Sequence, residues 1–380
     1  MYVTRPISQL LKSPGLLAAP PDGPNSGYLV IQDEEPATYS CFGWLKNTNL
    51  KNLPFPQDKE LIARYGNSDV SFDHLCFIPV LNQPLSSNRY YLIAPFGKHK
   101  GEAYTCSREE DKYTLCFLRV VKDVEPRPLD PQNIYQQFKI IKFGNDCFHA
   151  TSIAADGFAP YFLRRSDGWF TIHTNKAPPH FKLDIAQGLN AKLRARLSEF
   201  DFSLSRKSSE PVVVGKWYCP FIFVKEGTLR DQMVRSMYYE LTLEQRWEQI
   251  FTCRNNTNDN CVVIDTVLER EEVFVGGSKA VWNEKSVVDG VIWFTRHGKS
   301  VGLRVEIVER MKWEQETGGW KGGDERRVKI NKVEKFENAG GWSDFGYYVL
   351  VERFNLKRMD GSLVMSYDFK HFHQMKTKWE

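Results

Sequence analysis

One short stretch of the chain, GKHKG at residues 97–101, places two ammonium groups and an imidazole between glycines. Glycine lets a backbone approach an anion closely, so Lys98, His99 and Lys100 together could hold a phosphate or a carboxylate. The stretch lacks the G-x-x-x-x-G-K-[ST] spacing of a nucleotide-binding P-loop, and no helix follows it. The alternative interpretation is a basic hairpin loop that points into solvent, because motif matches this short are mostly false.

Two histidines near the C-terminus, His371 and His373, lie two residues apart in SLVMSYDFKHFHQMKTKWE. On a strand they would share one face and could begin a zinc site, but Asp368 would lie on the opposite face. The chain contains no H-E-x-x-H motif. Alternate residues from Leu363 to Met375 are mostly apolar. We therefore predict that this face packs inward, that the opposite polar face meets water, and that neither histidine binds metal.

Two cysteines, Cys106 and Cys219, are candidates for a catalytic nucleophile. Cys106 follows the basic stretch closely, and Cys219 follows a Trp-Tyr pair. Each would need a histidine brought close by folding, which sequence spacing cannot establish. A buried cysteine more often serves as a small hydrophobic residue.

Other catalytic signatures are absent from the sequence. There is no G-x-S-x-G motif for a serine hydrolase and no G-x-G-x-x-G motif for a dinucleotide. The acidic pairs Glu271-Glu272 and Glu314/Glu316 are interpreted as solvated faces. The catalytic residues are therefore unassigned, with Cys106, His99, Cys219 and the two C-terminal histidines as candidates, and the sequence predicts no cofactor and no metal.

Composition limits the class of protein. The 51 basic and 47 acidic residues are mixed along the 380-residue chain, which gives no basic patch for nucleic acid or an anionic membrane. No run reaches the roughly 18 apolar residues of a spanning helix, and the N-terminal residues lack a secretory signal. The eight cysteines contain no C-x-x-C pair. We therefore expect free thiols and a cytoplasmic location.

Aromatic and β-branched residues predict a mainly β fold. Residues 1–27 are an extended, Pro- and Gly-rich lead-in, and residues 28–145 show what looks like a duplicated β module. Each copy has a short apolar strand, a Cys-Phe strand and a turn with two prolines, found at residues 53–65 and 127–138. A single copy could not bury its apolar face alone.

The middle region, residues 146–258, is predicted to be mixed α+β with two or three helices. Leucines at 189, 193 and 197 suggest one helix, and a second begins at Thr228 with apolar residues every four positions up to Leu241. Thr242 with Gln245 forms a capping box for a third helix, LEQRWEQIF. The serine-rich stretch at 203–211 is predicted to be an exposed loop or linker.

The last region, residues 259–380, is predicted to be an antiparallel β-sandwich. Its apolar runs are short or alternating: VVIDTVL, EVFVGG, GVIWFT, VGLRVEIVERM, RVKINKVEKF, YYVLVERFNL and SLVMSYDF. Met-Asp-Gly-Ser at 359–362 predicts a hairpin turn, because Asp-Gly favours the positive φ of a tight loop.

Several long stretches resemble a known family. GPNSGYLVIQDEE, PVLNQPLSSNRYYLI, GKHKGEAYTCSREED, DPQNIYQQF, VVVGKWYCPF, MYYELTLEQRWEQIF and RMDGSLVMSYDFKHFHQ are similar to a plant-specific domain of unknown function, number twelve hundred and sixty-two. The likeness runs from Met1 to Glu380. It implies a land-plant source and an intracellular protein, and it brings no catalytic residues with it.

Three functions remain open from the sequence. The first is a non-enzymatic module that binds a small molecule or a protein in plant stress or defence, because β modules commonly present binding loops. The second is a cofactor-independent enzyme of plant metabolism with its site between the β modules. The third is a membrane-active β protein. A pocket with convergent His, Cys or carboxylate groups would favour the enzyme, and a flat, exposed aromatic patch would favour the binding module.

Overall fold

The computed structural model describes residues 1–33, 49–66, 69–115, 118–144, 146–173, 182–256, 259–283, 286–323, 325–338 and 340–380. The chain divides into two compact units. The first comprises Met1–Ala186, Tyr218–Tyr239 and Arg358–Asp360, and the second comprises Gln187–Trp217, Glu240–Lys357 and Gly361–Glu380. The Cys-Phe strands of the predicted duplication, at 41–42 and 116–117, lie outside the described residues.

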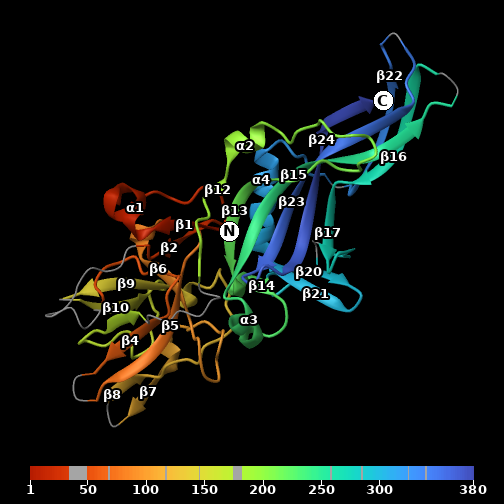
Figure 1. The fold of residues 1–380 in the computed structure, drawn as a ribbon. Coiled ribbons are helices and arrows are strands. Elements are labelled where there is room, and N and C mark those ends of the chain that lie inside the picture. Colours follow the sequence, from red (N-terminus) through yellow and green to blue (C-terminus); the bar gives the residue numbers. More distant parts are fainter. Residues whose placement is uncertain are drawn as a thin grey trace. The chain divides into compact units, whose positions relative to one another are not determined.

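Strands dominate both units, which confirms the predicted mainly β fold (Figure 1). The strands are β1 (Tyr2–Pro6), β2 (Gly27–Ile31), β3 (Asn49–Leu50), β4 (Leu61–Tyr65), β5 (Ser71–Pro79), β6 (Arg89–Ile93), β7 (Lys112–Leu115), β8 (Leu118–Val121), β9 (Phe138–Phe143), β10 (Cys147–Ser152), β11 (Phe170–His173), β12 (Gly188–Leu189), β13 (Val212–Pro220), β14 (Val224–Lys225), β15 (Tyr238–Arg254), β16 (Cys261–Glu269), β17 (Glu271–Val275), β18 (Ser278–Lys279), β19 (Val287–Val288), β20 (Val291–Arg296), β21 (Lys299–Arg304), β22 (Arg327–Lys335), β23 (Asp344–Arg358) and β24 (Leu363–Trp379). The helices are α1 (Ile7–Lys12), α2 (Ala191–Ala195), α3 (Leu229–Arg235) and α4 (Val305–Thr317), and the short 3-10 turns are η1 (Pro14–Leu17), η2 (Leu85–Ser87), η3 (Glu109–Asp111), η4 (Ile134–Gln136) and η6 (Phe221–Phe223). Within the described residues, no helix is long and apolar enough to cross a membrane.

The first unit is built on an antiparallel sheet in the order β10-β9-β6-β5-β4-β11-β3. One face of this sheet is covered by an apolar core in which the Phe55 ring lies 4.9 Å from both Phe77 and Phe148. Edge-to-face aromatic contacts of this kind add to the burial of apolar area. Outside this sheet, β1 and β2 pair in parallel from Tyr2 opposite Gly27.

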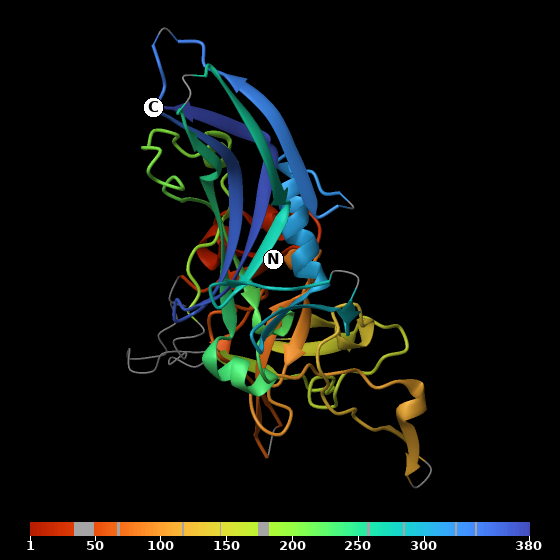
Figure 2. The ribbon, with the colours of Figure 1, turned by 90° about the vertical axis from the view of Figure 1, so that its right-hand side faces the viewer.

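The second unit contains a long sheet in the order β18-β17-β24-β23-β15-β13, and β12 pairs with β13 at its other edge. The three longest strands, β15, β23 and β24, run side by side in Figure 1. Helix α4, the blue helix of Figure 2, lies along one face, where Gln315 contacts His371 of β24. A two-stranded ribbon, β16 with β22, pairs throughout its length from Cys261 opposite Lys335.

The predicted secondary structure is wrong for two elements. The predicted helix after Thr242 is part of strand β15, in which Gln245 is buried beside its neighbours in the sheet. The predicted strand VGLRVEIVERM ends at Arg304, and the rest is helix α4, whose buried Ile307, Met311 and Glu314 follow the spacing of a helix. The other predicted strands of the last region are present as β16, β17, β20, β22, β23 and β24.

The predicted start at Thr228 is confirmed, because its hydroxyl accepts a hydrogen bond from the backbone N–H of Asp231 and α3 begins one residue later. The helix ends at Arg235, so it is shorter than the apolar spacing suggested. The turn at 359–362 joins β23 to β24, and Gly361 has a φ of 83°. The loop at 203–211 is mostly exposed, but Ser208 bridges to Glu248 of β15 and Ser209 is buried.

Strand β24 departs from the predicted division into an apolar and a polar face. Its polar side chains Ser366, Asp368 and Lys370 are all buried, and each pairs with a polar side chain of a neighbouring strand. A break in register between Leu350 opposite His371 and Val349 opposite Met375 interrupts the alternation. Extra residues on one strand form a bulge and turn the following side chains to a new direction.

Candidate functional site

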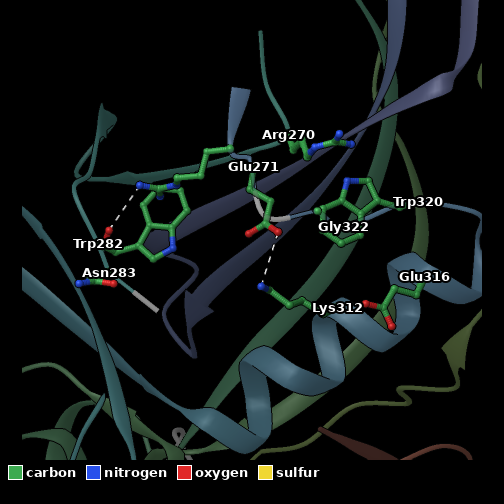
Figure 3. Close-up of a pocket in the computed structure, with 10 residues that line it drawn as sticks. Arg270, Glu271, Trp282, Asn283, Lys312, Glu316, Trp320 and Gly322 are labelled. Carbon is green, nitrogen blue, oxygen red and sulfur yellow. Dashed lines mark hydrogen bonds and ion pairs between the residues drawn. The ribbon is translucent and has the colours of Figure 1, made fainter. Parts of the chain in front are cut away.

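A pocket of about 450 Å³ opens in the second unit between strand β17 and helix α4 (Figure 3). It is large enough for a small organic molecule, because ligand pockets are typically a few hundred Å³ in volume. The residues that line it are Arg270, Glu271, Trp282, Asn283, Lys312, Glu316, Trp320, Gly322, Gly323 and Arg326. They come from β17, from the segment after β18, from α4 and from the loop between α4 and β22.

Helix α4 and the loop after it form one wall of the pocket. Lys312 and Glu316 lie four residues apart on α4, so they share the face that lines the pocket. After the helix the chain turns at Gly319, whose φ of 89° is one that other residues rarely adopt. This turn brings Trp320 against Phe369 of β24, with ring centroids 5.2 Å apart and nearly perpendicular planes. The pocket wall is thereby anchored to the sheet.

The guanidinium of Arg326 lies over the face of Trp282, with its carbon 3.7 Å from the ring centroid. This cation–π contact holds a permanent positive charge at the side of the pocket. One weak hydrogen bond, 3.5 Å long, joins the Nη1 of Arg326 to the Trp282 carbonyl.

The two other cations of the pocket are held in different ways. Arg270 donates from Nε to the Glu325 carbonyl and from Nη1 to the Lys321 carbonyl, both at 3.1 Å, so its plane is fixed by backbone. The Lys312 ammonium lies 3.6 Å from a carboxylate oxygen of Glu271, as the dashed line in Figure 3 shows. Neutral carbonyls do not offset the charge of Arg270, so of these two cations only Lys312 is balanced by an acid among the described residues.

The described lining residues carry an excess of positive charge, because three cations face two carboxylates. Among the lining residues that the structure describes, none is Cys, His, Ser, Thr or Tyr. Nucleophilic and general acid–base catalysis use such side chains and also Lys and carboxylates, of which the lining contains Lys312, Glu271 and Glu316. The excess of positive charge can attract and orient an anion.

The predicted anion loop at 97–101 is a turn whose basic groups face acidic partners. The Lys98 ammonium lies 3.3 Å from Glu125, and the His99 ring lies 2.6 Å from Glu102 and 3.5 Å from Glu125. Lys100 is half-buried in the same turn. These carboxylates neutralise most of the charge that an incoming anion would meet.

Both candidate cysteines are enclosed in the first unit. Cys106 is 2% exposed in the apolar core, and burial raises the pKa of its thiol to about 11. Cys219 is fully buried, and burial raises the pKa of its thiol to about 12. A thiol with such a pKa contains almost no thiolate near neutral pH, which is the form that attacks a substrate.

The two C-terminal histidines lie close together with ring centroids 5.3 Å apart, but their environments differ. His371 is buried, and its Nε2 lies 2.8 Å from the side-chain oxygen of Gln315 and 3.6 Å from Glu352. His373 is exposed, and partial burial with repulsion from His371 and Lys321 lowers its pKa. Within the described part of the chain, no three His, Cys, Asp or Glu side chains form a group that could hold a metal ion.

Glu352 is the centre of a buried polar network around His371. Arg194 donates to both of its carboxylate oxygens, at 2.9 and 2.6 Å, and Gln245 donates to one of them at 3.0 Å. Burial alone would raise the pKa of Glu352, but the hydrogen bonds from His371 and Arg194 lower it to about 2. Glu314, predicted to be solvated, is also buried here, beside Arg310.

Sequence reasoning missed the cations and tryptophans of the pocket, because they are spread from residue 270 to residue 326 and carry no catalytic spacing. One signal was present: the stretch GGWKGG at 318–323 places Trp320 and Lys321 between two glycine pairs. Such a stretch indicates a loop with tight turns and close packing, and it forms the pocket wall after α4.

Comparisons with known proteins identify one domain. Residues 22–117, about a quarter of the chain, match the family model described as "Protein of unknown function (DUF1262)". These residues therefore form a domain of unknown function. A search of curated proteins found no matching relative. Among solved structures, the chain is similar to one titled "Crystal structure of Cry35Ab1", with 10% identity, a TM-score of 0.49, and coverage of 86% of this chain and 90% of that chain.

Proposed function

We propose that this protein is a non-enzymatic binding protein and that the pocket of its second unit holds a small organic anion. The observation that carries the proposal is the guanidinium of Arg326, fixed over Trp282 beside a pocket of about 450 Å³. A guanidinium presents planar N–H donors that match a carboxylate or a phosphate. The ligand would therefore carry its anionic group toward Arg326.

The remaining lining residues suggest what the rest of the ligand looks like. Trp282 and Trp320 give two apolar walls, while Asn283 and Glu316 offer hydrogen-bonding groups at the exposed side. A compact organic molecule with an apolar or ring-shaped body and one carboxylate or phosphate suits this combination. A dianion would gain from both Arg326 and Arg270, because Arg270 has no acidic partner among the described residues.

Binding fits the geometry better than catalysis. The pocket contains no imidazole or thiol among its described residues, and the histidines at 371 and 373 do not line it. Cys106 and Cys219 have raised pKa values, so neither is activated as a nucleophile. The cysteine and histidine candidates of the enzyme hypothesis are thus not in the described lining of the pocket.

Isothermal titration calorimetry of the full chain tests the proposal. The panel pairs aromatic and aliphatic carboxylates and sugar phosphates with their neutral amide or alcohol counterparts. We expect at least one anion to bind, its neutral counterpart to bind at least tenfold more weakly, and Arg326→Met to reduce its affinity at least tenfold. The matched control is Arg327→Met, the neighbouring arginine, which lies outside the pocket on β22.

Two outcomes would contradict this function. One is the absence of any anion-selective binding in the panel. The other is an equal loss of affinity in Arg326→Met and Arg327→Met, which would mean that only the overall charge matters. Unfolding curves of both variants check that each remains folded.

We also propose, from the sequence expectations, that this binding takes place in the cytoplasm of a plant cell and serves stress or defence. The support is the resemblance of the long motifs to a plant-specific family. A fluorescent fusion followed by microscopy tests the location. Growth of a knockout line under pathogen and salt challenge tests the role, and unchanged growth would contradict it.

A further inference from the structure

Strand β4 of the first unit carries an exposed arginine between two exposed aromatic side chains. Arg64 lies opposite Phe72 of β5 on one side of β4 and opposite Phe170 of β11 on the other side. Residues directly opposite in antiparallel strands point to the same face, so the three side chains form one row across the sheet. Phe72 is 56% exposed and Phe170 is 41% exposed.

A second row of side chains lies on the same face, two residues away along β4. Ile62 of β4 pairs with His74 of β5 on one side and with Ile172 of β11 on the other. The ring of Phe96, itself 57% exposed, packs edge-on against His74 at 4.8 Å. We call the two rows and Phe96 the aromatic face. The opposite face of these strands is buried in the core of the first unit.

Apolar side chains gathered in this way are unusual on a surface that meets only water. Scattered exposed apolar residues need no explanation, but contiguous ones commonly mark an interaction site. The aromatic face contains two phenylalanines in one row and a third beside the second row, all more than two-fifths exposed. Their burial against a partner would release the water that now covers them.

Arg64 is the feature that identifies the chemistry of the partner. Its side chain has no hydrogen bond or ion pair with any residue that the structure describes. Two acids on or beside these strands are already engaged: Asp73 accepts a hydrogen bond from Tyr65, and Glu60 lies 2.8 Å from His74. A cation in the middle of an apolar row is complemented by a carboxylate with apolar neighbours.

We propose that the aromatic face docks an acidic amphipathic helix of a partner protein. Phe72 and Phe170 lie two strand spacings apart, about 9.5 Å, with Arg64 midway between them. Residues i and i+7 of a helix lie about 10.5 Å apart on one face, with i+3 and i+4 between them. Apolar residues at i and i+7 therefore contact the two phenylalanines, and a glutamate at i+3 or i+4 meets Arg64.

An extended peptide fits this row less well. Side chains on one face of a strand recur at about 6.8 and 13.6 Å, and neither spacing matches the two phenylalanines. Strand β4 itself is already paired on both sides, since it lies between β5 and β11. Edge-strand pairing is therefore not available at Arg64, and contact with one face of a helix fits the row better.

Fluorescence anisotropy with labelled synthetic peptides tests the docking. The probe is an alanine-based helical peptide of 18 residues with Leu at i and i+7 and Glu at i+3 and i+4, and its counterpart carries Lys at i+3 and i+4. We expect the full chain to bind the Glu peptide and to bind the Lys peptide at least tenfold more weakly. Arg64→Glu is expected to reverse this preference, because it exchanges the sign of the central charge.

Variants of the phenylalanines distinguish specific binding at the aromatic face from nonspecific hydrophobic binding. Phe72→Ala and Phe170→Ala should each weaken the Glu peptide at least fivefold. Phe143→Ala is the matched control, since Phe143 is 51% exposed on β9 of the same unit and lies outside the two rows. Failure of the Glu peptide to bind, equal binding of the two peptides, or an equal effect of Phe143→Ala would each overturn the proposal. Because the test uses no variant of Arg326, its failure would not contradict the function proposed for the pocket.

Discussion

The cores of the two units are stabilised by different kinds of interaction. The core of the first unit is a cluster of apolar and aromatic side chains, in which Phe55 contacts three other rings within about 6.1 Å. The second unit also has apolar clusters, but charged side chains are buried between them. Asp368 is 1% exposed, Glu352 is 1% exposed and Lys370 is 5% exposed.

The buried charges of the second unit are paired with good geometry. Asp368 accepts from Arg353 Nη2 at 2.7 Å and from Arg246 at 3.1 Å, and Lys370 donates to Glu272. Burial would raise the pKa of Glu272, but hydrogen bonds from Lys279 and Lys370 outweigh it and lower that pKa. An apolar core tolerates shape changes at moderate cost, whereas a buried pair that loses one member leaves an uncompensated charge.

The largest predicted effect breaks this charged core. Asp368→Asn keeps the shape of the side chain but leaves Arg353 and Arg246 without their shared carboxylate. We expect the free energy of unfolding to fall by about 3–5 kcal/mol, as when one partner of a buried ion pair is removed. Urea denaturation followed by tryptophan fluorescence measures it.

The same site offers a control that separates charge from packing. Replacing all three residues together, Asp368→Leu with Arg353→Met and Arg246→Met, should restore most of the stability lost in Asp368→Asn. If the triple variant is less stable than Asp368→Asn, the ion pairs stabilise this core more than apolar side chains in their place would. The contrast drawn here between the two cores would then be wrong.

The next largest effect depends on pH. Because hydrogen bonds hold the pKa of Glu352 at about 2 in the folded protein, against about 4.3 in an unfolded chain, its ionised form favours folding. This stabilisation is complete above pH 4.3 and is lost as the pH falls toward 2. It amounts to about 3 kcal/mol. The stability difference between the natural protein and Glu352→Gln should therefore shrink between pH 5 and pH 2; a constant difference would show that this linkage is absent.

A moderate effect is expected in the apolar core. Phe55→Leu removes ring contacts with Phe77 and Phe148 while keeping the site apolar. We expect a loss of about 1–2 kcal/mol that does not change between pH 5 and pH 2, because no charge is involved. A pH-dependent loss would mean that the two cores are coupled, contrary to the comparison. Denaturation at the two pH values supplies the data.

The smallest effect is expected at the surface loop 97–101. Lys98→Ala with Lys100→Ala should change the free energy of unfolding by less than about 0.5 kcal/mol, since the Lys98 side chain is 77% exposed. Phosphate should bind the double variant and the natural protein equally weakly, because Glu102 and Glu125 already occupy the basic groups of the loop. Stronger phosphate binding by the natural protein would restore the anion loop as a site.

The sequence by itself determined the features that depend on neighbouring residues. The hydroxyl of Thr228 caps a helix because it precedes one, and the Asp-Gly turn at 360–361 closes a hairpin because glycine tolerates a φ of 83°. The mainly β fold follows from β-branched and aromatic residues, which suit a pleated, partly buried surface. None of these features needs a distant partner.

The tertiary structure determined the type of those elements whose apolar spacing fits both a helix and a strand. Leu243, Trp247 and Phe251 lie four residues apart, which places them on one face of a helix and also on one face of a strand. Pairing in the long sheet resolves the ambiguity in favour of β15. Gln245, which would have closed a helix cap, instead donates to Glu352 and the Arg194 carbonyl.

Only the tertiary structure assembled the pocket and the aromatic face. Arg326 and Trp282 are 44 residues apart in the chain, yet the guanidinium lies over the indole; pairing of β16 with β22 places Arg326 beside Arg270, and the β17–β18 hairpin leads on to Trp282. Phe72 and Phe170 join Arg64 in one row because β5 and β11 both pair with β4. The type of each residue is local information, but which residues share a surface depends on strand order and register, and these are set by the burial of each unit's whole core.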